Sequence, residues 1–111
     1  RPQGIAMQKT KIEMVGANQL RYRTLVMQGG KSAREFSGEM HISLTLIQAG
    51  KPVMMEFPDP KSGDAGKLKL SFKQYQRVEG QISLPEGATV KSVQMTVLEK
   101  GELRAKQSVS L

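Results

Sequence analysis

Cysteine and tryptophan are absent from this chain of 111 residues, and its large aromatic side chains are two tyrosines and three phenylalanines. Without cysteine, the chain can form neither a disulfide bond nor a thiolate metal site. With so few aromatic residues, its core must be built from aliphatic side chains, and its seven methionines provide adaptable filler. The compartment stays open, because reduced cytosolic domains and unbridged periplasmic domains share this composition.

Long apolar runs are also missing from the sequence. No window reaches the roughly 18 apolar residues that a membrane-spanning helix requires, and no signal peptide is visible. Because the chain begins with Arg1 rather than methionine, we expect it to be a fragment or a processed form, with any membrane anchor upstream of Arg1. We expect residues 1–4 to be a flexible lead-in and residues 5–111 to form a single β domain.

Positive charge exceeds negative charge, with 17 lysines and arginines against 10 acidic residues and a formal net charge of +7. A basic surface favours anionic partners such as nucleic acid, lipid head groups or acidic glycans. However, the basic residues are spread over the whole chain, and no run of five or more occurs. This distribution is more typical of an ordinary solvated surface.

The strongest structural signal is the stretch from Lys67 to Pro85, which contains two runs of alternating apolar and polar residues. Alternation of this kind is typical of half-buried strands, because successive side chains point to opposite faces. Both runs are predicted strands, and we expect them to form the central strand pair of the domain. The predicted inward residues are Leu68, Leu70 and Phe72 in the first run, and Val78, Gly80, Ile82 and Leu84 in the second.

Six further strands are predicted, and turn-forming residues separate them. No stretch has the sustained apolar period and the caps of a helix. About eight strands without a helix predict an all-β fold, either an antiparallel β-sandwich or a small barrel. The six further strands are residues 5–15, 20–28, 36–48, 53–57, 88–98 and 103–111.

Three of these runs carry more detailed predictions. In residues 20–28, Leu25 and Met27 share a face with two arginines, which predicts either a bulge near Thr24 or a second half that is buried on both sides. In residues 36–48 and 88–98 the alternation is regular, and the predicted core residues are Met40, Ile42, Leu44, Leu46, Val93, Met95 and Val97.

The glycine-rich segment from Gly29 to Ala33 superficially resembles a phosphate-binding loop, because Lys31 and Ser32 follow its two glycines. The complete pattern requires another glycine at position 25 and a helix after the loop. Leu25 occupies that position and a strand is predicted to follow. A hairpin loop is therefore the favoured interpretation.

Metal sites and catalytic centres have no better support. Asp59 and Asp64 lie in a breaker-rich loop, but they lack the alternating oxygen ligands and the distal glutamate of a calcium site. His41 is the one histidine, and it is predicted to lie on an outward strand face without an acidic or hydroxyl partner nearby in sequence. We therefore predict no catalytic residue, no cofactor and no metal ligand, and we do not expect an enzyme.

The one candidate surface is a row of lysines in the predicted strand that ends near Phe72. Lys67, Lys69 and Lys73 would lie on one strand face, at spacings of about 7 Å or its multiples. Such rows contact phosphates, although reading bases would also require exposed aromatic side chains. A solvated face is favoured over a nucleic acid site. If their strands are neighbours, the complete anion-binding face is Lys67, Lys69, Lys73, Arg21, Arg23 and Arg77.

Two segments add a resemblance to a known family, RYRTLVMQGGKSAREFSGEMHISL and LSFKQYQRVEGQISLPEGATVKSVQMTVLEKG. The features that carry it are the LVMQGG turn, the strand start from Phe36 to Gly38, and the FKQYQRVEG and LPEG sequences. They resemble the C-terminal β domain of an uncharacterised family of proteobacterial proteins, over about Leu20 to Gly101. The resemblance implies a preceding membrane helix and coiled coil, and it provides no catalytic residues to transfer.

The expected function follows from these observations and from the resemblance. We expect a non-enzymatic interaction or structural domain of a membrane-anchored envelope protein, with another protein or an envelope component as its partner. The resemblance implies an inner-membrane anchor, a periplasmic location and homo-oligomerisation through the upstream coiled coil, while a cytoplasmic location stays open. The alternative is binding of an anionic polymer, or of nucleic acid, through the basic strand face.

Overall fold

The computed structural model of the chain describes residues 4–30, 34–61 and 68–111. Its regular elements are antiparallel β-strands, which confirms the predicted all-β class. No helix in the described residues is long and apolar enough to cross a membrane. The strands are β1 (Ile5–Met14), β2 (Gln19–Gln28), β3 (Phe36–Gln48), β4 (Lys51–Phe57), β5 (Lys69–Phe72), β6 (Tyr75–Ser83), β7 (Thr89–Glu99) and β8 (Glu102–Ser110).

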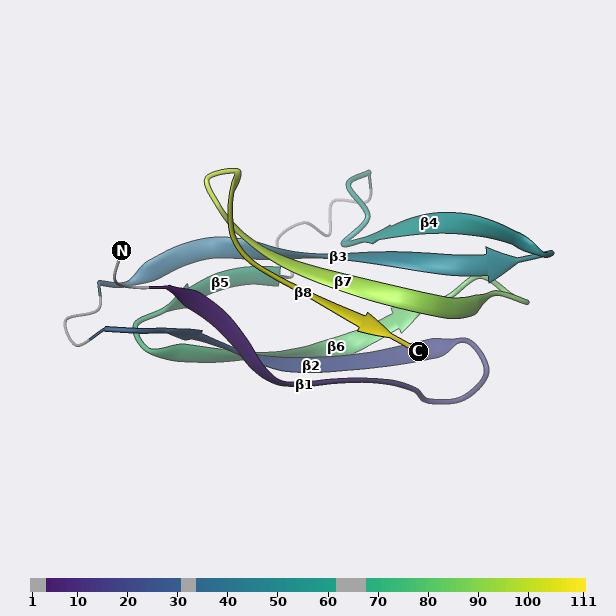
Figure 1. Cartoon of the computed structure of the whole chain (residues 1–111), viewed down its shortest axis with the longest axis horizontal. Helices are drawn as coiled ribbons and strands as arrows, with labels where there is room; N and C mark the ends of the chain where they lie inside the picture. Colours follow the sequence, from purple (N-terminus) through teal and green to yellow (C-terminus); the bar gives the residue numbers. More distant parts are fainter. Residues whose placement is uncertain (1–3, 31–33, 62–67) are drawn as a thin grey trace.

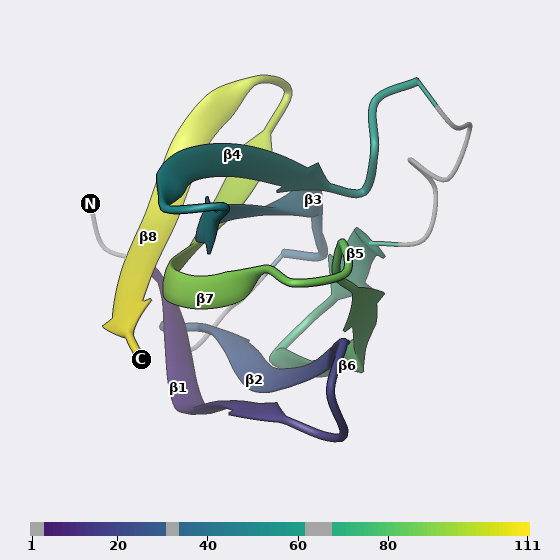
Figure 2. The ribbon, with the colours of Figure 1, turned by 90° about the vertical axis from the view of Figure 1, so that its right-hand side faces the viewer.

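The strands form two sheets that pack face to face as a sandwich (Figures 1 and 2). The three-stranded sheet has the order β1-β2-β6. The five-stranded sheet has the order β4-β3-β7-β8, and β5 pairs with β3 beside β4. No strand pairing among the described residues joins the two sheets, so the sandwich is the correct one of the two predicted architectures and the barrel is not.

The expected central strand pair is wrong. Strand β5 pairs with β3 in the five-stranded sheet, while β6 pairs with β2 at an edge of the three-stranded sheet. The predicted inward faces of both strands are nevertheless confirmed, since Leu70 and Ile82 are almost completely buried. Alternation reports which face of a strand is buried, but it does not report which strand is the neighbour.

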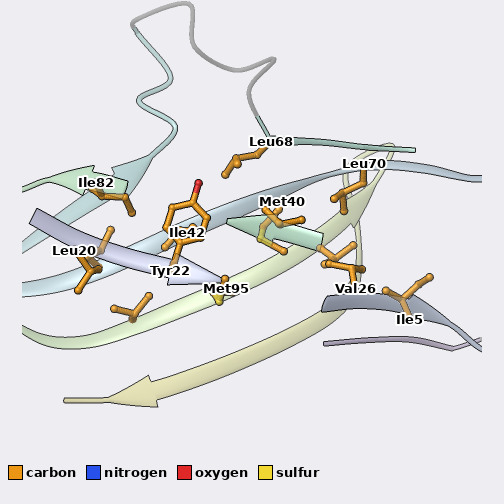
Figure 3. Packing of buried hydrophobic residues seen from close by; sticks show 14 of the residues in the cluster. Ile5, Leu20, Tyr22, Val26, Met40, Ile42, Leu68, Leu70, Ile82 and Met95 are labelled. Atoms are coloured by element: carbon orange, nitrogen blue, oxygen red, sulfur yellow. The ribbon is translucent and has the colours of Figure 1, made fainter. Parts of the chain in front are cut away.

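The core lies between the sheets and is centred on β3, whose alternation is as predicted (Figure 3). Its side chains are mainly aliphatic, and the ring of Tyr22 packs 6.2 Å from the ring of Phe57. A Cβ atom on Gly80, opposite Tyr22 in the ladder, would lie 2.6 Å from the Tyr22 hydroxyl, so the glycine leaves room for this ring. The fully buried residues include Leu20, Met40, Ile42, Leu44, Leu46, Leu70, Ile82, Val93, Met95 and Val97.

The predicted irregularity in residues 20–28 belongs to the neighbouring strand. In β2 the inward residues alternate without interruption, and Leu25 is half-buried on the outer face. The bulge lies in β1 between Gln8 and Lys11, opposite Thr24, and Lys9 there has a φ of 55°. The bulge near Thr24 is therefore real, but β1 contains the extra residue.

Two other predictions need correction. The segment after Gly29 is not a hairpin loop, because the strands before and after it, β2 and β3, belong to different sheets; residues 31–33 of this segment lie outside the described residues. The alternation in residues 103–111 predicts Leu103, Ala105, Val109 and Leu111 on one strand face. In β8, a register shift opposite Val97 and Leu98 interrupts this alternation and leaves Leu103 exposed.

Polar side chains occupy the two lateral openings between the sheets. On one side, the Thr10 hydroxyl lies 2.8 Å from the buried Thr24 hydroxyl and donates to Oε1 of Gln107 in β8 at 2.5 Å. On the other side, the Gln76 side chain accepts from the Ser71 N–H and donates to the Lys69 carbonyl of β5. The Gln76 amide thus takes the place of a neighbouring strand along β5.

Candidate functional site

The basic residues that the sequence suggested as one face lie in two places. Arg21, Arg23 and Arg77 are exposed on the outer face of the three-stranded sheet, and β2 and β6 are neighbours as that suggestion required. Lys69 belongs to β5 in the other sheet, and Lys73 lies in the β5–β6 connection. Lys67 falls outside the described residues. The five described residues therefore do not form a single row.

One of these arginines is paired with an acidic side chain. Arg21 Nη2 lies 3.0 Å from Oε2 of Glu13 in β1, and Lys11 Nζ lies 3.7 Å from Oε1 of the same carboxylate. The hydrogen bond from Arg21, followed by the charge of Lys11, holds the pKa of Glu13 below its ordinary value of 4.5. The local charge excess is correspondingly reduced.

The other two arginines line a shallow hollow of about 470 Å³ on the outer face, together with Lys9 and Glu79. The β1 bulge places Lys9 at its border, and Glu79 lies opposite Arg23 in the ladder. Arg77 also lines a second open hollow of about 390 Å³ at the β5–β6 side, which includes Lys69. These hollows can attract a small anion, but the carboxylate among the cations weakens that attraction.

His41 has a partner that the sequence did not indicate. Its Nε2 lies 3.2 Å from Oε2 of Glu39, two residues earlier on the outer face of β3. Both side chains are well exposed to solvent, so this pair lacks the burial that shifts the pKa of groups in catalytic centres. No group of three or more potential metal ligands occurs in the part of the chain that the structure describes; Asp64 lies outside that part.

A different feature, the outer edge of β4, is the candidate interaction site. Strand β4 is an outermost strand of the five-stranded sheet, at the end opposite β8 (Figure 1). Its exposed fractions are 36% for Val53 and 64% for Met54, two adjacent apolar residues that point to opposite faces. Contiguous exposed apolar residues on a sheet edge are typical of surfaces that bind other chains.

The turn before β4 determines which of its backbone groups point away from β3. Ala49 and Gly50 both have positive φ, 53° and 75°, as a two-residue type I′ hairpin requires. The closing pair, Gln48 and Lys51, is then hydrogen-bonded, and bonded pairs alternate from there. The residues of β4 whose backbone groups point to the open edge are therefore Pro52, Met54 and Glu56.

The hydrogen bonds of β5, which pairs with the first residues of β3, support this alternation. The Gln76 side chain bonds to the Ser71 N–H and the Lys69 carbonyl, so these β5 groups point away from β3. Strands β5 and β4 lie on the same side of β3. The backbone N–H and carbonyl groups of the even-numbered β3 residues therefore point to both of these strands. Outside the strand ladders, no backbone hydrogen bond within the described residues uses the N–H of Met54 or Glu56, and Pro52 has no N–H to offer.

A comparison with known families adds a classification. A model of a family of unknown function, DUF6776, matches residues 1–95. The chain belongs to this family. No curated protein and no solved structure matches the chain. The DUF6776 match includes β4 and ends within β7, and it agrees with the sequence-based resemblance in one respect, that of a domain of unknown function. The membrane anchor and the coiled coil stay predictions.

Sequence reasoning about this DUF6776 domain missed the β4 edge. It predicted a short strand at residues 53–57 without saying whether both sides would be paired. The one available signal was Pro52, because proline within a sheet is confined to edges, strand starts and bulges. Exposure of Val53 depends on the number of strands in each sheet, which no local pattern contains.

Proposed function

We propose that this domain is a non-enzymatic interaction module that binds an extended protein segment along the outer edge of β4. The observation that carries the proposal is the unpaired backbone of Met54 and Glu56 beside the exposed side chain of Val53. An added strand would satisfy these backbone groups and cover the apolar side chains, which is the physical basis of β-strand addition.

Contacts with other elements occupy part of three other strand edges, those of β5, β1 and β8. The Gln76 side chain occupies the edge of β5, and the hydrogen bond between Thr10 and Gln107 connects β1 to β8. On β4 the uncharged stretch from Pro52 to Met55 has no such cover within residues 4–30, 34–61 and 68–111. Lysines, other charges and proline usually protect free edges. On β4 these residues are Lys51, Pro52 and Glu56, and they leave Val53 to Met55 between them as the part of the edge open to a partner.

We further place the module in a longer envelope protein, held at the inner membrane by a segment upstream of Arg1. The support for this placement is the resemblance of residues 20–101 to the C-terminal domain of membrane-anchored coiled-coil proteins. The partner is then another protein or an envelope component that is accessible from the same compartment.

A site-specific crosslink in living cells tests the interaction. A photo-crosslinking amino acid at position 54 of the full-length protein is expected to form a discrete adduct after illumination. The same substitution at Met14, an exposed methionine (41%) of the other sheet, is the matched control. Adducts of equal pattern and yield at both positions, or no adduct at position 54, would contradict the proposal.

A further inference from the structure

We infer that the segment which pairs with the β4 edge is the β4 strand of a second copy of this chain, in antiparallel orientation about a two-fold axis through Met54. This inference rests on the proposed function, since it names the partner of the same edge. It would join the two five-stranded sheets into one continuous sheet with both three-stranded sheets on the same side.

The backbone groups of the edge are complementary to themselves in this register. Because residues opposite each other must share a face, the outward groups of Pro52, Met54 and Glu56 must pair among themselves. With Met54 opposite Met54 of the second copy, the two residues exchange reciprocal N–H to carbonyl bonds. Each Glu56 N–H then donates to the carbonyl of Pro52 in the other copy. The one acceptor without a donor is the Glu56 carbonyl opposite the proline nitrogen.

Neighbouring symmetric registers fit less well. Placing Pro52 opposite Met54 leaves each central pair with one hydrogen bond in place of two, because proline has no N–H. Placing Met54 opposite Glu56 keeps the hydrogen bonds, but the two Glu56 carboxylates become diagonal neighbours on one face, about 7–8 Å apart. In the Met54-centred register these carboxylates are separated by four positions, about 13 Å along the strands.

The side chains agree with the same register. On the outer face Met54 meets its own counterpart, and its sulfur already lies against the Thr45 hydroxyl at 3.4 Å. On the inner face Val53 lies opposite Met55 of the second copy. The exposed side chain of Val53, at this end of the core, therefore gains apolar contacts. The charged residues Lys51 and Glu56 lie towards the ends of the pairing, opposite uncharged residues.

The absence of cysteine permits a direct test of the register in the purified chain. In the variant Met54→Cys, the two cysteines would face each other with Cα atoms about 5.5 Å apart, within the range for a disulfide. Mild oxidation is expected to give a covalent dimer. The matched variant Glu56→Cys places its sulfurs more than about 10 Å apart and is expected to give no covalent dimer. Equal crosslinking of both variants, or none with Met54→Cys, would overturn the inference.

Sedimentation equilibrium without any cysteine provides the second measurement. We expect the parent chain to dimerise reversibly, and Met54→Lys, which opposes two ammonium groups at the axis, to raise the dissociation constant at least about tenfold. Met14→Lys is expected to leave it unchanged, and far-UV circular dichroism verifies that both variants fold. A parent that stays monomeric at millimolar concentration, or equal effects of the two substitutions, would refute the second-copy partner.

The two proposals fail in distinguishable ways. If the purified chain neither dimerises nor crosslinks at position 54, while a discrete adduct with another protein forms there in cells, the second-copy assignment is wrong and the interaction module stands. If position 54 forms no specific adduct in either setting, both proposals are wrong.

Discussion

Replacing Gly38 by alanine should destabilise this domain more than the same replacement at Gly80. A Cβ atom on Gly38 would lie 2.4 Å from the carbonyl oxygen of Leu98 and 2.9 Å from two atoms of the Phe36 ring. The oxygen belongs to the β3–β7 ladder, so it cannot move without breaking strand pairing. The ring is held by Phe72, with centroids 5.3 Å apart.

The magnitude follows from these contacts. Overpacking a well-packed core costs about 1–3 kcal/mol, and a backbone obstacle places Gly38→Ala at the upper end of that range or above it. The reduced freedom of the unfolded chain returns about 0.4–1 kcal/mol, which leaves a net loss of roughly 2 kcal/mol. At Gly80 the obstacle is the end of the buried Tyr22 side chain, with its hydroxyl at 2.6 Å and Cζ at 3.0 Å, and this ring must shift to admit a Cβ atom. We expect Gly80→Ala to cost about 1 kcal/mol, less than Gly38→Ala, because a side chain rather than ladder backbone gives way.

Urea unfolding of the parent and both variants, followed by circular dichroism, measures this difference. Gly38→Ala should lower the midpoint clearly, while Gly80→Ala should lower it less, both with an unchanged dependence on urea. If Gly38→Ala is as stable as the parent, or if both variants lose the same stability, the close approach of β3 to Leu98 is not as described.

Three further substitutions have definite expected outcomes. Phe72→Ala removes a buried ring that packs on Phe36 and should cost about 3–5 kcal/mol, so a thermal midpoint within a few degrees of the parent would show that the ring is not buried. His41→Ala should change the unfolding free energy by less than about 0.5 kcal/mol, because its contact with Glu39 is exposed; a larger loss in urea titrations would give it a structural role. The lowered pKa of Glu13 means that its pairing with Arg21 stabilises the fold above pH 4.5 and is lost as the pH falls through the folded-state value. Glu13→Gln should therefore narrow the stability difference between pH 7 and pH 3, and an unchanged difference would show that this pair is not formed in solution.

The strands themselves could be predicted from the sequence, because one face of each strand packs on the core. Strand β3 was predicted to its observed limits, Phe36 and Gln48, since its apolar residues alternate along its whole length. Pairing could not be predicted in this way. The runs that became β5 and β6 have the same alternation whether they pair with each other or with β3 and β2, so their separation into two sheets depends on the whole chain.

The candidate site shows the same limit. Alternation correctly predicted that Arg21 and Arg23 share an exposed face, but it could not show that Lys69 belongs to the other sheet. It also could not show that Val53 would lack cover, because that depends on β4 having no neighbour beyond it. Of the residues at this edge, Pro52 alone carried local information, through its missing N–H.

The pairing of β2 with β6 has a consequence for how the chain folds. These strands join Gln19–Met27 to residues 75–83, while the β1–β2, β3–β4 and β7–β8 pairs are hairpins between consecutive strands. Contacts between such distant segments form late and slow the folding of β proteins. During synthesis, one edge of β2 in the β1–β2 hairpin stays unpaired until β6 has been synthesised. That interval is when this domain is most exposed to misassembly with other nascent chains.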